Sequence, residues 1–113
     1  MAECLFCKIV NREVQSGIIY EDQNVIAFND INPQAPVHIL VIPKKHIPTL
    51  LDIKDEDRNL LFSLQKVITD IARQKNLTDG FRVVINCGPN AGQAIYHLHF
   101  HLLGGRKMEW PPG

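Results

Sequence analysis

One segment of the chain, residues 55–75, has the spacing of a long amphipathic helix, and this segment most constrains the fold. Its apolar residues fall at i, i+1, i+4, i+7, i+8, i+11 and i+12, which places them on one stripe of a helix. They are Leu60, Leu61, Leu64, Val67, Ile68, Ile71 and Ala72. Acidic residues fill the first turn, where negative charge suits the helix dipole, and Gly80 follows the end. A helix with a single apolar stripe needs another layer of structure to cover it.

The other periodic segments are strand-like and occur in runs on both sides of this helix. Short stretches rich in β-branched and aromatic residues predict strands over residues 18–20, 25–28, 37–42, 81–86 and 95–103. The polar residues 21–24 join the first two strands as a hairpin, and residues 5–10 are predicted to form one or two helical turns. Strands in runs, without strict alternation with helices, favour the α+β class. We expect a mainly antiparallel five-stranded sheet with one long helix and a short N-terminal helix.

The composition limits the size of the protein and the kinds of partner. With 113 residues the chain has room for one ordinary domain, residues 1–113. Its 12 Lys and Arg balance its 12 Asp and Glu, so it lacks the positive field of a nonspecific nucleic-acid binder. Apolar runs such as residues 39–42 are far short of the roughly 20 residues that span a bilayer. We expect no partner of either kind, neither nucleic acid nor membrane.

The cysteines and the first residues bear on the compartment. Three cysteines, Cys4, Cys7 and Cys87, are too few for a disulfide scaffold. Residues 1–4 have neither the basic nor the apolar region of a secretory signal. These features predict a protein of the reducing cytoplasm.

Three histidines that alternate along the last predicted strand carry the chemical information. Alternate side chains of a strand share a face, so His97, His99 and His101 are expected to point the same way, about 6.6 Å apart. The residues between them are expected to pack against the long helix: Tyr96, Leu98, Phe100 and Leu102. One histidine in a sheet is usually structural, but three in one register on the non-packing side indicate a functional site.

Two kinds of chemistry suit three such imidazoles. They are able to hold a zinc ion with an open position for water. Alternatively, one imidazole is a nucleophile toward phosphorus and its neighbour is a phosphate ligand. The preceding loop, residues 88–93, is small and permissive and brings backbone N–H groups close to an anion. The loop favours phosphoryl or nucleotidyl transfer over a zinc hydrolase.

Residues 97–103, His-Leu-His-Phe-His-Leu-Leu, resemble the signature of the histidine-triad (HIT) family. Residues 28–38, 40–47 and 103–113 resemble the Hint branch of that family, so the resemblance covers essentially the whole chain. It implies a HIT-like fold and the activity of a purine nucleoside phosphoramidase. Such an enzyme cleaves the P–N bond of adenylyl amidates, or of similar aminoacyl-adenylate-like substrates, through a covalent nucleotidyl-histidine and releases AMP or GMP.

The resemblance also implies roles for individual residues. The nucleophile is His99, His101 contacts the α-phosphate, and His38 is a supporting hydrogen-bond partner. Three further positions match phosphate-contacting residues, namely Asn86, Gly92 and Gln93, and the backbone N–H of Ala94 is also able to contact the phosphate. One position, Asp30, matches the acceptor of the ribose hydroxyls, and an apolar slot for the purine comprises Phe6, Ile9, Phe28 and Ile31. The family commonly has Ser or Thr where this chain has Ala94, which puts a hydroxyl-dependent proton relay to the leaving amine in doubt.

Cys4 and Cys7 have the spacing of half a zinc site, and the spacing alone leaves open whether they are simply two buried thiols. Many bacterial-type relatives in the Hint branch carry this pair, and the resemblance adds His46 and His97 as the other two ligands. A four-ligand site is closed and hence structural, so we expect zinc there and no cofactor for catalysis.

The resemblance further implies a homodimer in which the C-terminal segment, with Trp110, reaches toward the partner's active site. Two other functions remain open at this point. One is a purine-nucleotide-binding adaptor with little catalysis, which the alanine at position 94 suggests. The other is the zinc-dependent hydrolase.

Overall fold

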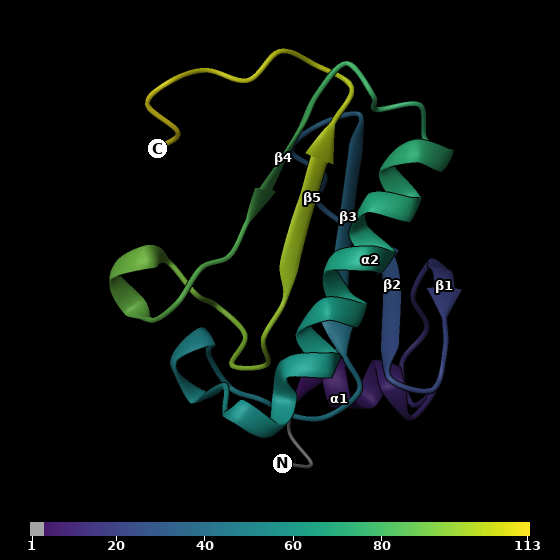
Figure 1. Cartoon of the computed structure of the whole chain (residues 1–113), viewed down its shortest axis with the longest axis vertical. Helices are drawn as coiled ribbons and strands as arrows, with labels where there is room; N and C mark the ends of the chain where they lie inside the picture. Colours follow the sequence, from purple (N-terminus) through teal and green to yellow (C-terminus); the bar gives the residue numbers. More distant parts are fainter. Residues whose placement is uncertain (1–3) are drawn as a thin grey trace.

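The computed structural model describes residues 4–113 and contains one five-stranded sheet with α1 and α2 on opposite faces (Figure 1). The elements, with η for a 3-10 turn, are α1 (Leu5–Val10), β1 (Ile18–Glu21), β2 (Val25–Asn29), β3 (Val37–Pro43), η1 (Leu50–Asp52), η2 (Asp55–Asp57), α2 (Arg58–Gln74), β4 (Phe81–Val84), η3 (Pro89–Ala91) and β5 (Phe100–Gly104). The strand order is β1-β2-β3-β5-β4, and every neighbouring pair is antiparallel. The predicted α+β class, sheet and helices are confirmed.

The two faces of the sheet have separate apolar cores. Alternation along β2 and β3 sends one set of side chains toward α2, namely Val25, Ala27, Ile39 and Val41. The other set, Ile26, Phe28, Leu40 and Ile42, packs with Phe6 and Ile9 of α1. The predicted stripe of α2 covers the first core, with its last five residues buried. Both faces of β2 and β3 are thus covered, and apart from Asn29 and His38 every residue of these two strands is apolar.

The start of the long helix differs slightly from the prediction. Residues 55–57 form the 3-10 turn η2, and the α-helix begins at Arg58. The carboxylate of Asp57 accepts hydrogen bonds from the backbone N–H of Lys54 at 3.0 Å and from Nζ of Lys45 at 2.6 Å. Asp57 therefore fastens the loop after β3 to the beginning of α2.

The last strand is shorter than predicted, because β5 begins at Phe100 and not near residue 95. The ladder between β3 and β5 ends at the pair Val41 and Phe100. Pro43 lies two residues further along β3 and has no N–H to continue the ladder. The N–H of Leu98 instead donates to the carbonyl of Ile47 in the loop after β3, at 2.6 Å. His97 and His99 consequently precede the strand.

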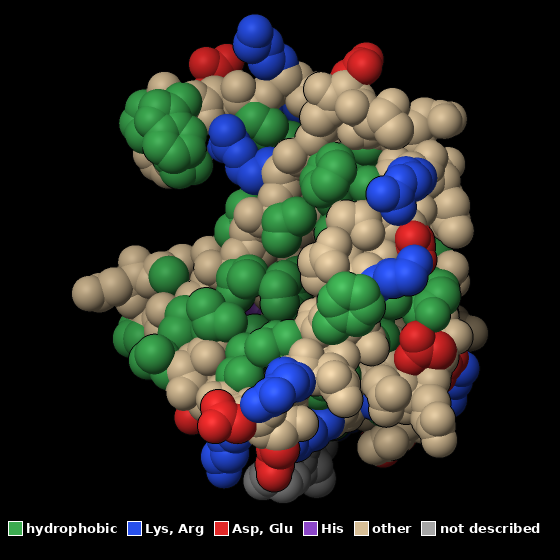
Figure 2. Space-filling view, viewed as in Figure 1, with side chains coloured by type: hydrophobic (Ala, Val, Ile, Leu, Met, Phe, Trp, Pro, Cys, Tyr) green, Lys and Arg blue, Asp and Glu red, His purple; other side chains and the backbone are tan. Residues whose placement is uncertain are grey.

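One edge of the sheet and the C-terminal segment leave apolar side chains uncovered. Phe81 and Val83 on the edge strand β4 are each 40% exposed, and Trp110 is 81% exposed. Hydrophobic side chains gather on this side of the molecule, around a hollow beneath the C-terminal segment (Figure 2). The histidines are almost hidden on the face that carries α2 (Figure 2).

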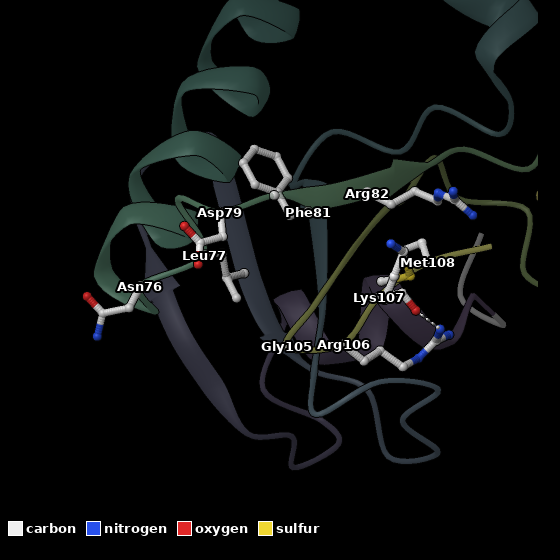
Figure 3. A pocket seen from close by; sticks show the side chains of 10 residues that line it. Asn76, Leu77, Asp79, Phe81, Arg82, Gly105, Arg106, Lys107 and Met108 are labelled. Carbon is white, nitrogen blue, oxygen red and sulfur yellow. Dashed lines mark hydrogen bonds between the residues drawn. The ribbon is translucent and has the colours of Figure 1, made fainter. Parts of the chain in front are cut away.

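A cavity of about 680 Å³ lies between the end of α2, the start of β4 and the segment after β5 (Figure 3). Its basic side chains hold the chain in place: Nη2 of Arg82 donates to the carbonyl of Glu109 at 2.9 Å, and Nε of Arg106 to that of Gln34 at 3.2 Å. No histidine lines this cavity, so it is separate from the candidate site. Within residues 4–113, none of the helices has the length and apolarity that a membrane span requires.

Candidate functional site

An apolar cavity of about 240 Å³ lies beside α1 on the α1 face of the sheet, and it brings together the residues expected to hold a purine. Phe6 and Ile9 line it from α1 and Phe28 lines it from β2, and all three are buried. Ile31 also lines it but is 96% exposed, so it stands at the rim. Asp30 follows β2 and is part of the same wall.

The cavity contains further apolar residues that the sequence did not indicate. Val14 lies in the segment between α1 and β1, and Ile95 lies in the bend before β5. Val14 belongs to no predicted element, and Ile95 is predicted only as the first residue of the last strand. Only the folded arrangement brings them to this wall.

His38 and His101 form a hydrogen-bonded pair whose proton positions follow from their partners. The backbone N–H of Gln34 donates to Nδ1 of His38 at 3.0 Å, so this nitrogen carries no proton. The neutral ring then carries its proton on Nε2, which donates to Nδ1 of His101 at 2.9 Å. His101 in turn carries its proton on Nε2, a buried atom without a hydrogen-bond partner in the structure. The pair therefore ends in an unused N–H donor.

The ring of His99 lies beside that of His101, with ring centroids 5.0 Å apart. Nδ1 of His99 is 2.7 Å from the backbone carbonyl oxygen of His97. A carbonyl only accepts, so Nδ1–H donates, and the lone pair of the neutral ring is on Nε2. The edge-to-face contact with Phe6, with centroids 5.1 Å apart, supports the ring from the α1 side. The site thus combines a basic nitrogen with a neighbouring N–H donor.

Burial keeps the paired histidines neutral. Burial first, and then the neighbouring imidazoles of His99 and His38, lower the pKa of His101 to about 4, while Asp30 opposes the shift. Burial also lowers the pKa of His38, against the attraction of the Asp30 carboxylate, whose Oδ2 is 3.4 Å from Nε2 of His38. Both rings are uncharged at neutral pH, in agreement with the donor and acceptor order given above.

The expectation of a free anion-binding loop at residues 88–93 is not supported by its hydrogen bonds. The N–H of Gly92 donates to the carbonyl of Pro89, and the N–H of Gln93 donates to that of Gly88. The buried side chain of Gln93 accepts from the N–H of Gly88 at 2.9 Å and donates to the carbonyls of Pro48 and Ile95. Gln93 therefore holds the loop together in this conformation, and both N–H groups of its side-chain amide are already used.

Asn86 and Ala94 flank this loop on its two sides. Asn86 is half-buried and follows β4, which ends at Val84 and not at Asn86 as predicted. Ala94 is exposed and precedes the bend that contains His97. The side chain of Ala94 has no polar atom to offer a substrate.

The three triad histidines lie on one side of the sheet as predicted, but His97 serves a different site from the other two. His97 and His99 both contact Phe6 of α1, and His101 pairs with Leu40 on the same face. The prediction of an open, non-packing face is wrong, since His97 is fully buried and His99 only 7% exposed. On the α2 side, Leu98, Phe100 and Leu102 pack as predicted, whereas Tyr96 is 44% exposed and lies outside that core.

Cys4, Cys7, His46 and His97 converge on one point, as the resemblance implied. Nδ1 of His97 is 3.4 Å from Sγ of Cys4 and 3.1 Å from Nδ1 of His46, and Sγ of Cys7 is 3.3 Å from Nδ1 of His46. Ligand atoms around a tetrahedral zinc, with bonds of about 2.3 Å to sulfur and 2.0–2.1 Å to nitrogen, are roughly 3.3–3.8 Å apart. Nε2 of His97 donates to the carbonyl of Pro43 at 2.7 Å, which leaves Nδ1 free to bind a metal. These residues fit zinc.

Asp30, His38 and His101 are a second group of potential metal ligands, but their geometry indicates a hydrogen-bonded pair. The nitrogens of the two rings are 2.9 Å apart, a normal distance for an N–H···N hydrogen bond. The other nitrogen of His38 is already used by the N–H of Gln34. An open catalytic zinc on three triad histidines is also excluded geometrically, because His97 faces the cysteines.

Comparisons with known proteins identify the family of the chain. A family model described as the HIT domain matches residues 11–108. An uncharacterized HIT-like protein of Synechococcus elongatus is 53% identical over 98% of this chain and 97% of its own length. The 14 kDa zinc-binding protein of Zea mays is 51% identical over 96% of this chain and 87% of its own. The crystal structure of a HIT family hydrolase from Legionella pneumophila has a TM-score of 0.97 and 48% identity, covering 98% of this chain and all of that one. The chain belongs to the histidine-triad (HIT) family.

Proposed function

We propose that this chain, as one HIT domain of residues 1–113, is a purine nucleoside phosphoramidase with His99 as its nucleophile. The observation that carries the proposal is the pair of fixed proton positions. The carbonyl of His97 leaves the lone pair of His99 on Nε2, and the His38–His101 pair leaves an N–H donor beside it. Neutral imidazole attacks phosphorus well, and a nearby donor stabilises the charge that develops on the phosphoryl oxygens.

The substrate would occupy the apolar cavity and its polar rim. The purine would lie among Phe6, Ile9 and Phe28, with Ile31 closing over it from the rim. A carboxylate oxygen of Asp30 would accept hydrogen bonds from the ribose hydroxyls. Nε2–H of His101 would donate to the α-phosphate, and Asn86 and Ala94 would border the phosphate. In this proposal Gly92 and Gln93 shape the loop near the phosphate.

The reaction proceeds in two displacements. Nε2 of His99 forms a bond to the α-phosphorus as the P–N bond breaks, and the leaving amine takes up a proton. Water then attacks the phosphorus of the nucleotidyl-histidine, loses a proton and releases AMP or GMP, which restores the neutral ring. The chain accelerates both steps by positioning the reacting groups.

Zinc at Cys4, Cys7, His46 and His97 would be structural. All four positions of a tetrahedral ion are filled by protein, so the ion would supply cross-linking and no reactive water. The name of the zinc-binding relative from Zea mays supports metal binding. The free thiols support a reducing compartment such as the cytoplasm.

We further propose a homodimer, supported by the uncovered edge of the sheet. An edge strand with exposed apolar side chains is a template for pairing with another chain. β4 is such a strand, and Trp110 in the segment beyond β5 is also exposed. A partner across β4 would cover both and bring the C-terminal segment toward the neighbouring active site.

A second candidate function is a purine-nucleotide-binding adaptor with little catalysis. The observation that favours it is Ala94, which has no hydroxyl to pass a proton to the leaving amine. Such an adaptor would bind AMP and leave a phosphoramidate intact.

The test is to incubate the zinc-loaded protein with adenosine 5′-phosphoramidate labelled in the nucleotide, and to follow AMP release by chromatography. We expect turnover in the wild type and a loss of at least about 1000-fold in His99→Ala. Quenching in mid-turnover and peptide mapping should find the label on His99. Label on another residue, or full turnover in His99→Ala, contradicts the mechanism. Binding of AMP without any turnover favours the adaptor.

A further inference from the structure

The helix α1 belongs to both sites of this protein. Cys4 and Cys7 offer their sulfurs to the metal site, and Phe6 lies between them in the sequence. The ring of Phe6 lines the nucleotide cavity and also meets the ring of His97, with centroids 5.9 Å apart. One short segment thus carries half of the metal ligands and part of the pocket for the base.

Phe6 is in contact with the groups that the proposed reaction uses. Its ring meets that of His99 edge-to-face at 85°, with centroids 5.1 Å apart. It also meets the ring of Phe28, which lines the same cavity, with centroids 5.5 Å apart. A displacement of Phe6 therefore changes both the pocket for the purine and the support of His99.

The position of α1 depends on its side-chain contacts and not on helix propensity. It has six residues, and an isolated helix of that length is unstable in water. Its anchors are the burial of Phe6 and Ile9 against the sheet and the two sulfurs beside His46 and His97. With a metal bound, the two sulfurs tie the start of α1 to the loops after β3 and before β5.

The histidine side of the metal site is held in place without the metal. Nε2 of His97 donates to the carbonyl of Pro43, and the N–H of Leu98 donates to that of Ile47. His97 therefore keeps its position, and its carbonyl keeps the proton of His99 on Nδ1, whether or not zinc is present. Phe6 is the contact between the two sites that is sensitive to the metal.

We propose that Phe6 is a positioning residue that couples zinc binding to nucleotide binding. Zinc fixes α1 so that Phe6 completes the pocket and supports His99, which raises the affinity for a purine nucleoside monophosphate. Because coupling is reciprocal, the nucleotide raises the affinity for zinc by the same factor. This inference rests on the proposed function, since it requires a purine nucleotide to bind in the apolar cavity.

The experiment measures the coupling from both sides. AMP is titrated calorimetrically into zinc-loaded protein and into protein freed of metal by a chelator. We expect AMP to bind roughly three- to tenfold more tightly to the zinc form, because aromatic contacts change affinity by about this factor. Competition with a chromophoric chelator then measures the affinity for zinc with and without saturating AMP, and we expect the same factor.

Two variants locate the coupling in Phe6. Phe6→Leu retains an apolar side chain and all four metal ligands, so zinc binding without AMP should be unchanged while the coupling factor falls toward one. Ile31→Ala is the matched control: Ile31 lines the same cavity, lies outside α1 and is 96% exposed. It should weaken AMP binding equally in the zinc-loaded and metal-free forms and preserve the coupling factor.

The outcomes separate this inference from the proposed function. If AMP binds equally well with and without zinc, the coupling is refuted and the nucleotide site stands. If AMP binds to neither form, the nucleotide site fails and the coupling fails with it. If the metal-free protein lacks the circular-dichroism spectrum of the folded state, the coupling reflects global folding. The coupling then persists in Phe6→Leu, and this result also overturns the role of Phe6.

Discussion

Nε2 of His38 on β3 lies 2.9 Å from Nδ1 of His101 on β5, and this contact fixes the proton of His101 on Nε2. The two residues are diagonal neighbours on one face, because His101 stands opposite Leu40 in the ladder. The antiparallel register therefore determines which ring nitrogen of His101 carries the proton.

Removing the imidazole of His38 should impair turnover through His101. In His38→Ala, Nδ1 of His101 loses its donor, so the ring no longer favours the tautomer with Nε2–H. We expect kcat/KM for adenosine 5′-phosphoramidate to fall about 10- to 100-fold. His38→Gln retains an N–H donor and should recover part of the loss. Equal activity in His38→Ala and the wild type would show that the pair does not orient His101.

The stability of the fold should decrease in mild acid because of His101. Its pKa of about 4 in the folded protein is below the unfolded value of about 6.5, so the unfolded chain binds more protons between these values. The stabilisation is complete above about pH 6.5 and is lost as the pH falls toward about 4. Urea unfolding measures the free energy of unfolding at several pH values. This free energy should depend less strongly on pH in His101→Leu than in the wild type. Because the metal ligands are the same in both proteins, the difference reports on His101.

Removing the metal should lower the thermal stability. Zinc that binds only the folded state, present at about 100 times its dissociation constant, stabilises it by roughly 2.7 kcal/mol. We expect a chelator to lower the Tm of the wild type to near that of Cys7→Ser, which should no longer respond to zinc. Cys87→Ser is the control, since Cys87 lies outside the four-residue group. A Tm that is unaffected by chelation would argue for two free thiols in place of a zinc site.

A hydroxyl at position 94 should speed release of the amine. Ala94 is exposed, so Ala94→Ser fits without repacking and restores the side chain that the family commonly has there. We expect turnover to rise up to about tenfold with little change in AMP affinity, since the hydroxyl helps only the leaving group. Ala91→Ser, another exposed alanine in the same loop, should leave turnover unchanged. A rise in both variants would point to loop polarity and not to a proton relay.

A charge on the β4 edge should disrupt the proposed dimer. Lysine on an edge strand opposes pairing with a second sheet, so Val83→Lys should shift the protein toward monomer in analytical ultracentrifugation. Ile19 lies on β1 at the other edge and is 37% exposed, close to the 40% of Val83. Ile19→Lys should leave the dimer intact. If only Ile19→Lys dissociates the dimer, the interface is at β1 and not at β4.

The sequence predicted the elements whose signal is local. The stripe from Leu60 to Ala72 identified α2, and the α+β class followed from the grouping of the strands. The start of β5 was missed because its cause lies in another strand, where Pro43 lacks the N–H that would extend the ladder. The alternation of side chains within residues 95–103 does not indicate that the neighbouring strand lacks an N–H donor at Pro43.

The candidate site was predicted mainly through the family resemblance, and its physical details required the fold. Neither spacing nor composition indicates that Gln93 uses its amide within the loop, or that Val14 lines the cavity. The proton positions of His99 and His101 depend on contacts with the carbonyl of His97 and the ring of His38, the latter 63 residues away along the chain. Such contacts exist only after folding.

His97 acts through two different parts of itself: its imidazole faces the sulfurs, and its carbonyl faces His99. Every amino acid has the carbonyl, but only histidine provides that imidazole. In a related protein without the two cysteines, another residue at position 97 would still orient the nucleophile through its backbone carbonyl. The first histidine of the triad is therefore the one that evolution is chemically free to replace, while positions 99 and 101 keep their constraint.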